Sequence, residues 1–209
     1  MHEFSMDAQS HWDKVHAIRR PEEVSWYCPH LEISLALIER SASSLAAPII
    51  DVGGGASTLV DDLLLRGYEN VTVLDISKEA LQVARRRLDM NAGRVHWLVA
   101  DVLTAKLEPA AYEIWHDRAV FHFLTRSEER AAYLRQMAQA LKSGGHVIMS
   151  TFGPAGPPTC SGLDVMRYDE KALQKEFGKQ FHLVEGSCEL HHTPEGITQE
   201  FLYCHFRRI

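Results

Sequence analysis

The fold of this chain is decided by the stretch Pro48-Ile49-Ile50-Asp51-Val52-Gly53-Gly54-Gly55-Ala56-Ser57-Thr58. A short apolar run leads into an aspartate and three consecutive glycines, after which a helical pattern begins. This order predicts a buried strand, a tight turn and the start of a helix. Glycine suits such a turn because it adopts backbone angles closed to other residues and lets a ligand approach the main chain. Because amide groups at the start of a helix favour ligands with negative charge or many acceptors, the turn predicts a nucleotide-like ligand.

The spacing of the glycines separates the classes of nucleotide ligand. A dinucleotide fingerprint requires a glycine where Thr58 stands, and a phosphate-binding loop requires a Gly-Lys-Ser/Thr sequence that is absent here. What remains is an acidic residue before the glycines, in the pattern Asp51-x-Gly53-x-Gly55. This pattern resembles the first motif of the class I S-adenosylmethionine-dependent methyltransferases. An ordinary tight turn between a strand and a helix is the alternative interpretation.

Length and composition restrict the class of protein. The 209 residues suit one domain, and a net charge of −6 with a pI near 6.0 favours neither nucleic acid nor a membrane surface as a partner. The sequence contains no apolar run long enough for a membrane span and no signal-peptide pattern. Four widely spaced cysteines without a CxxC pair favour free thiols in a reducing compartment, so we expect a cytoplasmic protein without a metal site.

Apolar patterns along the chain predict strands that alternate with helices. The predicted strands are 48–52, 71–74, 94–100, 112–116 and 146–151. The predicted helices are 30–45, 56–66, 77–90, 125–141 and 169–177, with Ser77 and Asp169 as N-caps and Thr125 and Glu128 as a capping box. Runs 181–191 and 197–206 predict a terminal hairpin, whereas residues 1–29 show no regular pattern and 153–162 predict a loop. The fold class is therefore α/β, with a mostly parallel sheet and helices on both faces.

An aspartate follows or ends each of four predicted strands. They are Asp51, Asp75, Asp101 and Asp117. Because ligands of open α/β sheets bind beyond the carboxyl ends of the strands, the set predicts a binding site there, although any single one could be a cap or a turn residue. Asp75, followed by Ile76, lies about 20 residues beyond the glycines, where a carboxylate can accept both ribose hydroxyl protons.

The methyltransferase resemblance extends over most of residues 49–151. The segment Tyr112-Glu113-Ile114-Trp115-His116-Asp117-Arg118-Ala119-Val120-Phe121-His122-Phe123-Leu124 is similar to the segment after strand four of small bacterial class I methyltransferases. The terminal hairpin resembles the antiparallel end of their seven-stranded, Rossmann-like sheet. The resemblance implies that Asp51, Gly53, Gly54, Gly55, Asp75, Ile76, Asp101, Val102 and Asp117 bind the cofactor, with Asp101 and Val102 at the adenine.

Two departures from family patterns bear on the methyl acceptor. The Asn/Asp-Pro-Pro-aromatic sequence of enzymes that methylate amino groups of nucleic acids is replaced by His116-Asp117-Arg118-Ala119. The Asp-Lys-Gly sequence of similarly sized protein-lysine methyltransferases is also absent. Both departures favour a small-molecule acceptor.

Several side chains are candidates for catalysis or acceptor binding. His116 and His122 flank the end of the fourth strand and are the predicted catalytic residues, although loop or core histidines are the alternative. Cys160 lies in the predicted loop after strand five, with an inert buried thiol as its alternative. The adjacent His191 and His192 would point to opposite faces of a strand, so a shared metal ion is not expected.

Aromatic residues precede the cofactor-binding core. Trp12-Asp13-Lys14 and Ser25-Trp26-Tyr27 resemble the N-terminal segment that covers the cofactor in this family. Trp12, Trp26 and Tyr27 are therefore predicted lid residues, which could instead simply anchor the segment on the core. The expected organisation is one domain: a lid and helix (1–46), a cofactor-binding core (47–152) and a substrate-side loop, helix and hairpin (153–209).

Together these features predict an S-adenosylmethionine-dependent methyltransferase acting on a small molecule. An NAD-dependent oxidoreductase is the first alternative, opposed by Thr58 at the third glycine position and by the terminal hairpin. A cofactor-binding regulatory protein without catalysis is the second, because no catalytic base is secure.

Overall fold

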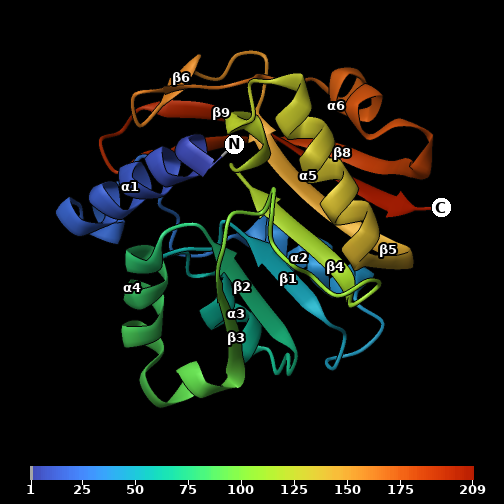
Figure 1. Ribbon diagram of the computed structural model, residues 1–209, viewed down its shortest axis with the longest axis horizontal. Helices are drawn as coiled ribbons and strands as arrows, with labels where there is room; N and C mark the ends of the chain where they lie inside the picture. The colour runs from blue at the N-terminus through green and yellow to red at the C-terminus, as the bar shows by residue number, and fades with distance from the viewer. Residues whose placement is uncertain (1) are drawn as a thin grey trace.

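The computed structural model describes the backbone of residues 2–209 and the side chains of residues 8–209. Seven strands form one sheet in the order β3-β2-β1-β4-β5-β9-β8, and a two-stranded sheet, β6-β7, lies beside it (Figure 1). The strands are β1 Ile49–Val52, β2 Val71–Asp75, β3 Val95–Val99, β4 Tyr112–Arg118, β5 Leu141–Phe152, β6 Thr159–Cys160, β7 Leu163–Asp164, β8 Phe181–His192 and β9 Thr198–Arg208. Strands β1 to β5 run parallel, whereas β9 is antiparallel to both β5 and β8.

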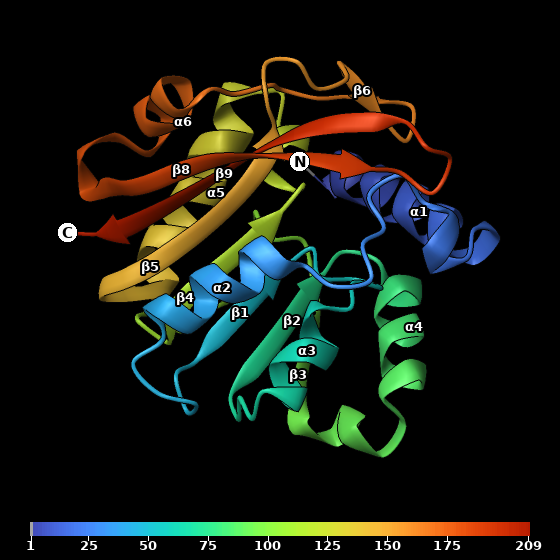
Figure 2. The ribbon, with the colours of Figure 1, turned by 180° about the vertical axis from the view of Figure 1, so that it is seen from behind.

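Helices cover both faces of the seven-stranded sheet. The α-helices are α1 His2–Ile18, α2 Glu32–Ser41, α3 Leu59–Leu65, α4 Lys78–Leu88, α5 Ser127–Ala140 and α6 Glu170–Phe177. Figure 1 shows α5 in front of β4 and β5, and Figure 2 shows α2 and α3 against the opposite face. The α/β fold with a mostly parallel seven-stranded sheet and a terminal antiparallel hairpin confirms the predicted fold class. No helix in the part of the chain that the structure describes has the length and apolar character needed to span a membrane.

Alternation along the strands decides which side chains can reach the site. Ile49 packs into the hydrophobic cluster beneath α2 and α3, whereas Ile50 packs into the cluster beneath α5 and α6. Because successive strand residues point to opposite faces, Asp51 lies on the face of Ile49. The register pairs Asp51 with Val73 of β2 and with His116 of β4. Asp75 lies two residues beyond Val73 and therefore on the same face. The polar side chains of Asp51, Asp75 and His116 are thereby brought together at the carboxyl ends of three strands.

Two predicted N-caps are confirmed, whereas the predicted capping box is displaced by one residue. The side chains of Ser77 and Asp169 accept hydrogen bonds from Ala80 N and Ala172 N, which confirms both caps. The capping box was predicted one residue too early, because Arg126 is the N-cap of α5 and the Glu129 carboxylate accepts from its amide.

Several other predicted boundaries of helices and strands were wrong. The first predicted helix ends at Ser41 instead of residue 45, and α3 begins at Leu59 instead of residue 56, since the glycine turn continues to Thr58. Strand β5 begins at Leu141, before the two glycines, because Leu141 pairs with Tyr112 of β4. Residues 2–18 form α1, although their apolar residues show no helical period.

Candidate functional site

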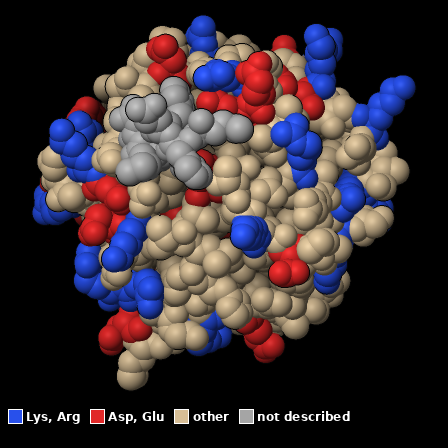
Figure 3. All heavy atoms as spheres, in the orientation of Figure 1, with Lys and Arg blue, Asp and Glu red and all other residues tan. Residues whose placement is uncertain are grey.

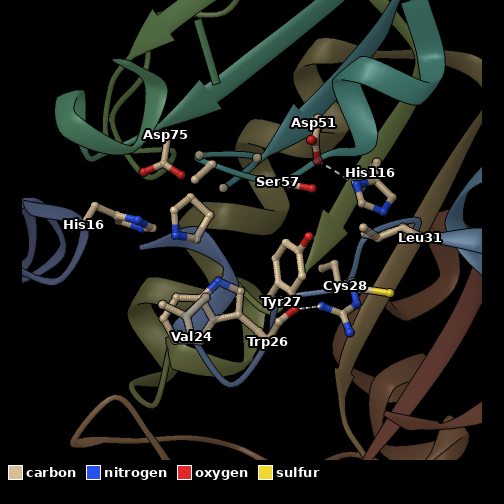
Figure 4. Close-up of a pocket in the computed structure, with 16 residues that line it drawn as sticks. His16, Val24, Trp26, Tyr27, Cys28, Leu31, Asp51, Ser57, Asp75 and His116 are labelled. Atoms are coloured by element: carbon tan, nitrogen blue, oxygen red, sulfur yellow. Dashed lines mark hydrogen bonds and ion pairs between the residues drawn. The ribbon is translucent and has the colours of Figure 1, made fainter. Parts of the chain in front are cut away.

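A cavity lies at the carboxyl ends of β1, β2 and β4, beneath a covering segment (residues 8–31) of which the part 16–31 lines the cavity (Figure 4). The cavity has a volume of about 70 Å³, and the hollow together with the open solvent at its mouth measures about 620 Å³. One wall consists of the glycine turn and the strand ends, with Asp51, Asp75 and His116. The opposite wall belongs to the covering segment, from which Trp26 and Tyr27 face the cavity. The cavity therefore lies between the sheet and the N-terminal segment.

The glycine turn fits tightly against the two aspartates of the sheet wall. Gly53 has φ +68° and its amide donates to Leu74 O at 2.7 Å, which closes the turn on β2. A Cβ atom on Gly54 would lie 2.4 Å from Asp51 Oδ2, and one on Gly55 would lie 2.7 Å from Asp75 Oδ2. Larger residues at positions 54 and 55 would displace these carboxylates, so both glycines are needed to keep the acids in place.

Asp75 ends β2 and presents a buried carboxylate to the cavity. Asp75 is only 9% exposed, and its Oδ1 accepts a hydrogen bond from Ser77 N at 2.7 Å. Burial raises the pKa of Asp75 to about 7, although the amide of Ser77 works in the opposite direction. The main chain holds one oxygen of this sheltered carboxylate. Asp75 is therefore suited to accept hydrogen bonds from the hydroxyl groups of a ligand.

Asp51 and His116 form a buried pair at the other end of the same wall. His116 Nδ1 lies 2.7 Å from Asp51 Oδ1, and His116 Nε2 lies 2.9 Å from Ser34 Oγ of α2. The side chains of His116 and Asp51 are 1% and 3% exposed. Asp51 Oδ2 has no hydrogen-bond partner within the described residues. Because a buried carboxylate oxygen without a donor is costly, this atom calls for a donor from a ligand.

The covering segment is held in place by polar contacts with the sheet half. Asp13 of α1 accepts hydrogen bonds from Ser77 Oγ at 2.7 Å and Glu79 N at 3.3 Å, at the start of α4. Arg118, at the end of β4, donates from Nη1 to Trp26 O at 3.0 Å. The segment is thus fastened at both sides of the cavity.

Aromatic side chains add apolar contacts beneath the covering segment. The Trp12 ring lies 5.9 Å from the Trp26 ring and 5.1 Å from the Phe123 ring, in edge-to-face arrangements. Such pairs stabilise packing beyond the area that they bury. Trp26 and Tyr27 line the cavity, whereas Trp12 supports Trp26 from outside the lining.

Three predicted adenine-side residues lie next to the cavity but outside its lining. Asp101 Oδ1 accepts from Leu103 N at 2.9 Å in the turn after β3. Val102 is buried in the hydrophobic cluster beneath α5, and Ile76 is half-buried before α4. The main chain connects this turn to the site, because Ala100 N donates to Asp75 O at 2.9 Å.

Asp117 and His122 lie away from the cavity. Asp117 points to the α5 face, since it follows His116 along the strand, and it accepts hydrogen bonds from Val120 N and the Tyr133 hydroxyl. His122 is fully buried and its Nδ1 accepts from Phe152 N. Burial lowers the pKa of His122 to about 3, so this ring stays neutral at physiological pH.

Cys160 also lies outside the cavity lining. It is 7% exposed, on β6, within the hydrophobic cluster beneath α2. Burial raises the pKa of its thiol, which keeps it protonated.

Several cavity residues were not predicted from the sequence as site residues. They are His16, Pro21, Val24, Cys28, Leu31, Ala56, Ser57 and Arg118. Arg118 carried a usable signal, because it shares strand parity with His116 and so faces the same side of β4. The unpredicted residues of the covering segment carried no such signal, because this segment has an irregular backbone that no sequence period describes.

The observed wall fits a nucleoside ligand that carries an amino-acid-like cationic group. Asp75 and Asp51 provide acceptors for ligand hydroxyl and ammonium protons, and the close-fitting glycines keep side chains out of the ligand's path. The aromatic rings of the covering wall suit a ligand with a flat base or a sulfonium.

Comparison with known proteins agrees with this geometry. Residues 49–145 match the family model for a methyltransferase domain. The ubiquinone biosynthesis O-methyltransferase of Yersinia pestis (strain Pestoides F) is 29% identical over 116 residues, which cover 55% of this chain and 46% of that relative. The chain therefore matches about half of the length of the curated relatives.

Solved structures share the fold along nearly the whole chain. An S-adenosylmethionine-dependent methyltransferase from Anabaena variabilis has a TM-score of 0.75 and 16% identity, and the match covers 99% of this chain and 95% of the Anabaena chain. The 1,6-didemethyltoxoflavin-N1-methyltransferase of Burkholderia thailandensis, solved with S-adenosylhomocysteine, has a TM-score of 0.71 and 18% identity, covering 99% and 89%. The chain therefore has the fold of these S-adenosylmethionine-dependent methyltransferases, and residues 49–145, slightly less than half of it, match the methyltransferase-domain family model.

Proposed function

We propose that this protein transfers a methyl group from S-adenosylmethionine to a small-molecule acceptor. The observation that carries the proposal is the sheet wall, where the Asp75 carboxylate and the unsatisfied Asp51 Oδ2 flank a glycine turn that leaves no room for side chains. When bound, S-adenosylmethionine supplies an electrophilic methyl group on a sulfonium. The protein's own residues bind, orient and shield the reactants, which can supply much of the rate enhancement of such a transfer.

Each predicted cofactor residue has a role in this proposal. Asp75 accepts the ribose hydroxyl protons and Asp51 Oδ2 accepts an ammonium proton, while Gly53, Gly54 and Gly55 admit the cofactor to the main chain. Asp101 is kept as the adenine-side residue, since its turn is bonded to Asp75 through Ala100 N. Ile76 and Val102 support that side by packing, and Asp117 supports the turn after β4 through its bond with Val120 N.

The acceptor would lie between the end of β4 and the covering segment. This part of the cavity is lined by Trp26, Tyr27, Cys28 and Leu31, which form a largely apolar wall. Neither predicted catalytic histidine presents a free nitrogen there, because both nitrogens of His116 are bonded and His122 lies outside the lining. We therefore propose catalysis by positioning and exclusion of water, with His116 and His122 in supporting roles.

Charge and the state of the cysteines support the proposed kind of partner and the proposed compartment. Lys and Arg side chains are interspersed with Asp and Glu on the face drawn in Figure 3, and the net charge is −6. These features favour a small molecule over nucleic acid as the acceptor. Cys28, Cys160, Cys188 and Cys204 are all free, which supports the cytoplasm as the compartment.

Calorimetric titration with S-adenosylhomocysteine tests the cofactor. We expect micromolar binding by the wild type and a loss of at least about tenfold in Asp75→Ala, because charged hydrogen bonds to the ribose are removed. Asp164→Ala, an exposed aspartate on β7, is the matched control and should bind as the wild type does. Absence of wild-type binding at millimolar ligand would overturn the proposal, and thermal protection by NAD instead would favour an oxidoreductase.

A second measurement separates an enzyme from a regulatory protein. Wild-type protein that binds S-adenosylhomocysteine is incubated with S-adenosylmethionine and a panel of small phenols, thiols, amines and carboxylic acids. We expect S-adenosylhomocysteine to accumulate with at least one acceptor and not with Asp75→Ala. Binding without turnover across the panel would instead support a cofactor-binding protein without catalysis.

A further inference from the structure

A continuous series of buried polar side chains runs beneath the cavity from Asp51 to the covering segment. His116 joins Asp51 and Ser34 at 2.7 and 2.9 Å, and the hydroxyls of Ser34 and Tyr203 lie 3.4 Å apart. Arg118 Nε donates to the Tyr203 hydroxyl at 3.1 Å. The side chains come from β1, β4, α2 and β9, so the series exists only in the folded protein.

One assignment of protons satisfies the hydroxyls and ring nitrogens of the series. Arg118 can only donate, so the Tyr203 oxygen accepts and its own proton is left for Ser34. The Ser34 hydroxyl then donates to His116 Nε2, and His116 Nδ1 donates to Asp51 Oδ1. With a neutral imidazole, every step has one donor and one acceptor, and the direction of donation runs from Arg118 to Asp51. Such chains of hydrogen bonds strengthen one another inside a protein.

The series ends at a carboxylate of which only one oxygen is used. His116 holds Oδ1 of Asp51, and Oδ2 is buried without a partner in the residues that the structure describes. Asp51 lines the cavity, and Figure 4 shows its bond to His116 on the opposite side of the cavity from Asp75. Fixing Oδ1 therefore fixes the orientation of the oxygen that remains for a ligand.

We infer that His116, itself oriented by Ser34, is a positioning residue that holds Asp51 so that Oδ2 binds the ammonium group of the cofactor's amino-acid part. The inference rests on the proposed function, because it assigns the recipient of the free oxygen. It gives His116 a role that needs no free ring nitrogen. It also explains why β4 has a histidine at this buried position, where an apolar residue would otherwise fit. The histidine is bonded to Asp51 of the adjacent strand β1.

Two ligands that differ in the amino-acid part distinguish this role from a general structural one. S-Adenosylhomocysteine carries the ammonium group, whereas 5′-methylthioadenosine shares its adenosine and sulfur but lacks the amino acid. We expect His116→Leu to weaken S-adenosylhomocysteine about tenfold and 5′-methylthioadenosine less than twofold, because only the first ligand uses Asp51. His116→Asn can keep a donor near the Nδ1 position and should restore most of the affinity.

Ser34→Ala and Tyr203→Phe complete the calorimetric series. Ser34→Ala leaves the imidazole in place and should weaken S-adenosylhomocysteine alone, by about threefold. Tyr203→Phe leaves His116 bonded to Ser34, so it should lower the melting temperature while the ratio of the two affinities stays at the wild-type value. Asp75→Asn is the opposite control and should weaken both ligands, since both contain the ribose.

The outcomes separate the inference from the function on which it rests. Equal losses for both ligands in His116→Leu, or no loss in a folded variant, would overturn the positioning role while the cofactor assignment stands. If His116→Leu does not fold, the same criteria apply to Ser34→Ala. Failure of the wild type to bind either ligand would overturn the proposed function and this inference with it.

Discussion

The two walls of the cavity are built in opposite ways. The sheet wall takes Asp51 and the glycines from one continuous stretch and Asp75 from the next strand, all packed with almost no free space. The covering wall comes from an irregular segment whose Trp26 and Tyr27 are only partly buried. It is held by separate contacts with distant parts of the chain. They are Asp13 with the start of α4, Arg118 with Trp26 O, Thr58 Oγ1 with Cys28 O and His191 with Ser25 O.

This difference assigns a different physical task to each wall. The cavity volume of about 70 Å³ is well below the roughly 300 Å³ that small-ligand pockets usually provide. A nucleoside ligand therefore needs more room than this volume provides, and the covering segment is joined to the rest of the chain by a few hydrogen bonds and ring contacts. We therefore expect the sheet wall to act as a preformed cradle and the covering wall to open and close over it.

The largest expected effect comes from filling the cradle. In Gly54→Ala the new Cβ would lie 2.4 Å from Asp51 Oδ2 and 2.7 Å from Val73 Cγ1, so the carboxylate must move. We expect a loss of about 100-fold in affinity for S-adenosylhomocysteine, because a displacement of about 1 Å can cost that much, and a loss of about 1 to 3 kcal/mol in stability. Calorimetry and urea unfolding measure the two effects.

Gly93→Ala is the matched control for that substitution. A Cβ atom at position 93 would meet nothing within 4 Å, in the 3-10 turn before β3. The control should retain wild-type affinity and stability. Unchanged binding by folded Gly54→Ala would show that the turn is flexible and would remove the contrast between the walls.

The same contrast explains how far the sequence was informative. The strand, the glycine turn and the position of Asp75 at the end of its strand were predicted correctly, because their signals are local: apolar runs, glycines and acids at strand ends. Asp117 has the same local signal, but it points to the α5 face because it is one residue beyond His116 on the strand. Strand parity, which needs the register of the sheet, separates these two cases.

The covering segment had no such local signal. Helix α1 was not predicted, since its apolar residues follow no helical period, and its position depends on Asp13 at α4 and Trp12 against Phe123. The bonds of His116 also depend on long-range pairing, with partners 65 and 82 residues away in sequence. Local sequence patterns identify the wall that is built locally, whereas the covering wall was expected only from the family resemblance that named Trp12, Trp26 and Tyr27 as lid residues.

The second prediction uses the cost of burying Asp75. Burial raises the pKa of Asp75 to about 7, above its unfolded value of about 4. Between these values the folded state binds the proton more tightly, so this group's contribution to stability falls as pH rises towards 7 and stays low above it. Asp75→Asn removes this loss, and we expect it to be about 1 to 2 kcal/mol more stable than the wild type at pH 8 but not at pH 4.

Urea unfolding of both proteins at the two pH values measures this difference. In parallel, Asp75→Asn should bind S-adenosylhomocysteine about tenfold more weakly at pH 8, because the amide replaces a carboxylate acceptor. The pair of results would show a cradle that trades stability for binding. A variant less stable than the wild type at pH 8 would contradict the desolvation of Asp75.

The third prediction weakens the covering wall without touching the cradle. Trp12→Ala removes the ring contacts with Trp26 and Phe123. We expect faster dissociation of S-adenosylhomocysteine in stopped-flow fluorescence and about a threefold to tenfold loss of affinity, since the closed position loses part of its apolar contact. Trp97→Phe, in the half-buried β3 strand away from the covering segment, should leave the dissociation rate unchanged. Equal rates in Trp12→Ala and the wild type would mean that the covering segment does not control release.

The smallest effect is expected at the fastening between α1 and α4. Asp13→Ala removes an acceptor for Ser77 Oγ and Glu79 N, whereas Asp169→Ala removes the cap of α6, whose carboxylate accepts from Ala172 N. Each loss should cost about 0.5 to 1 kcal/mol, typical of a helix cap. Only Asp13→Ala should also expose residues 8–28 to proteolysis and weaken S-adenosylhomocysteine, by about twofold, because Asp13, unlike Asp169, connects the covering wall to the sheet half. Equal proteolysis of the two variants would contradict a covering wall that opens independently, and the cavity would then open by movement of the whole N-terminal half.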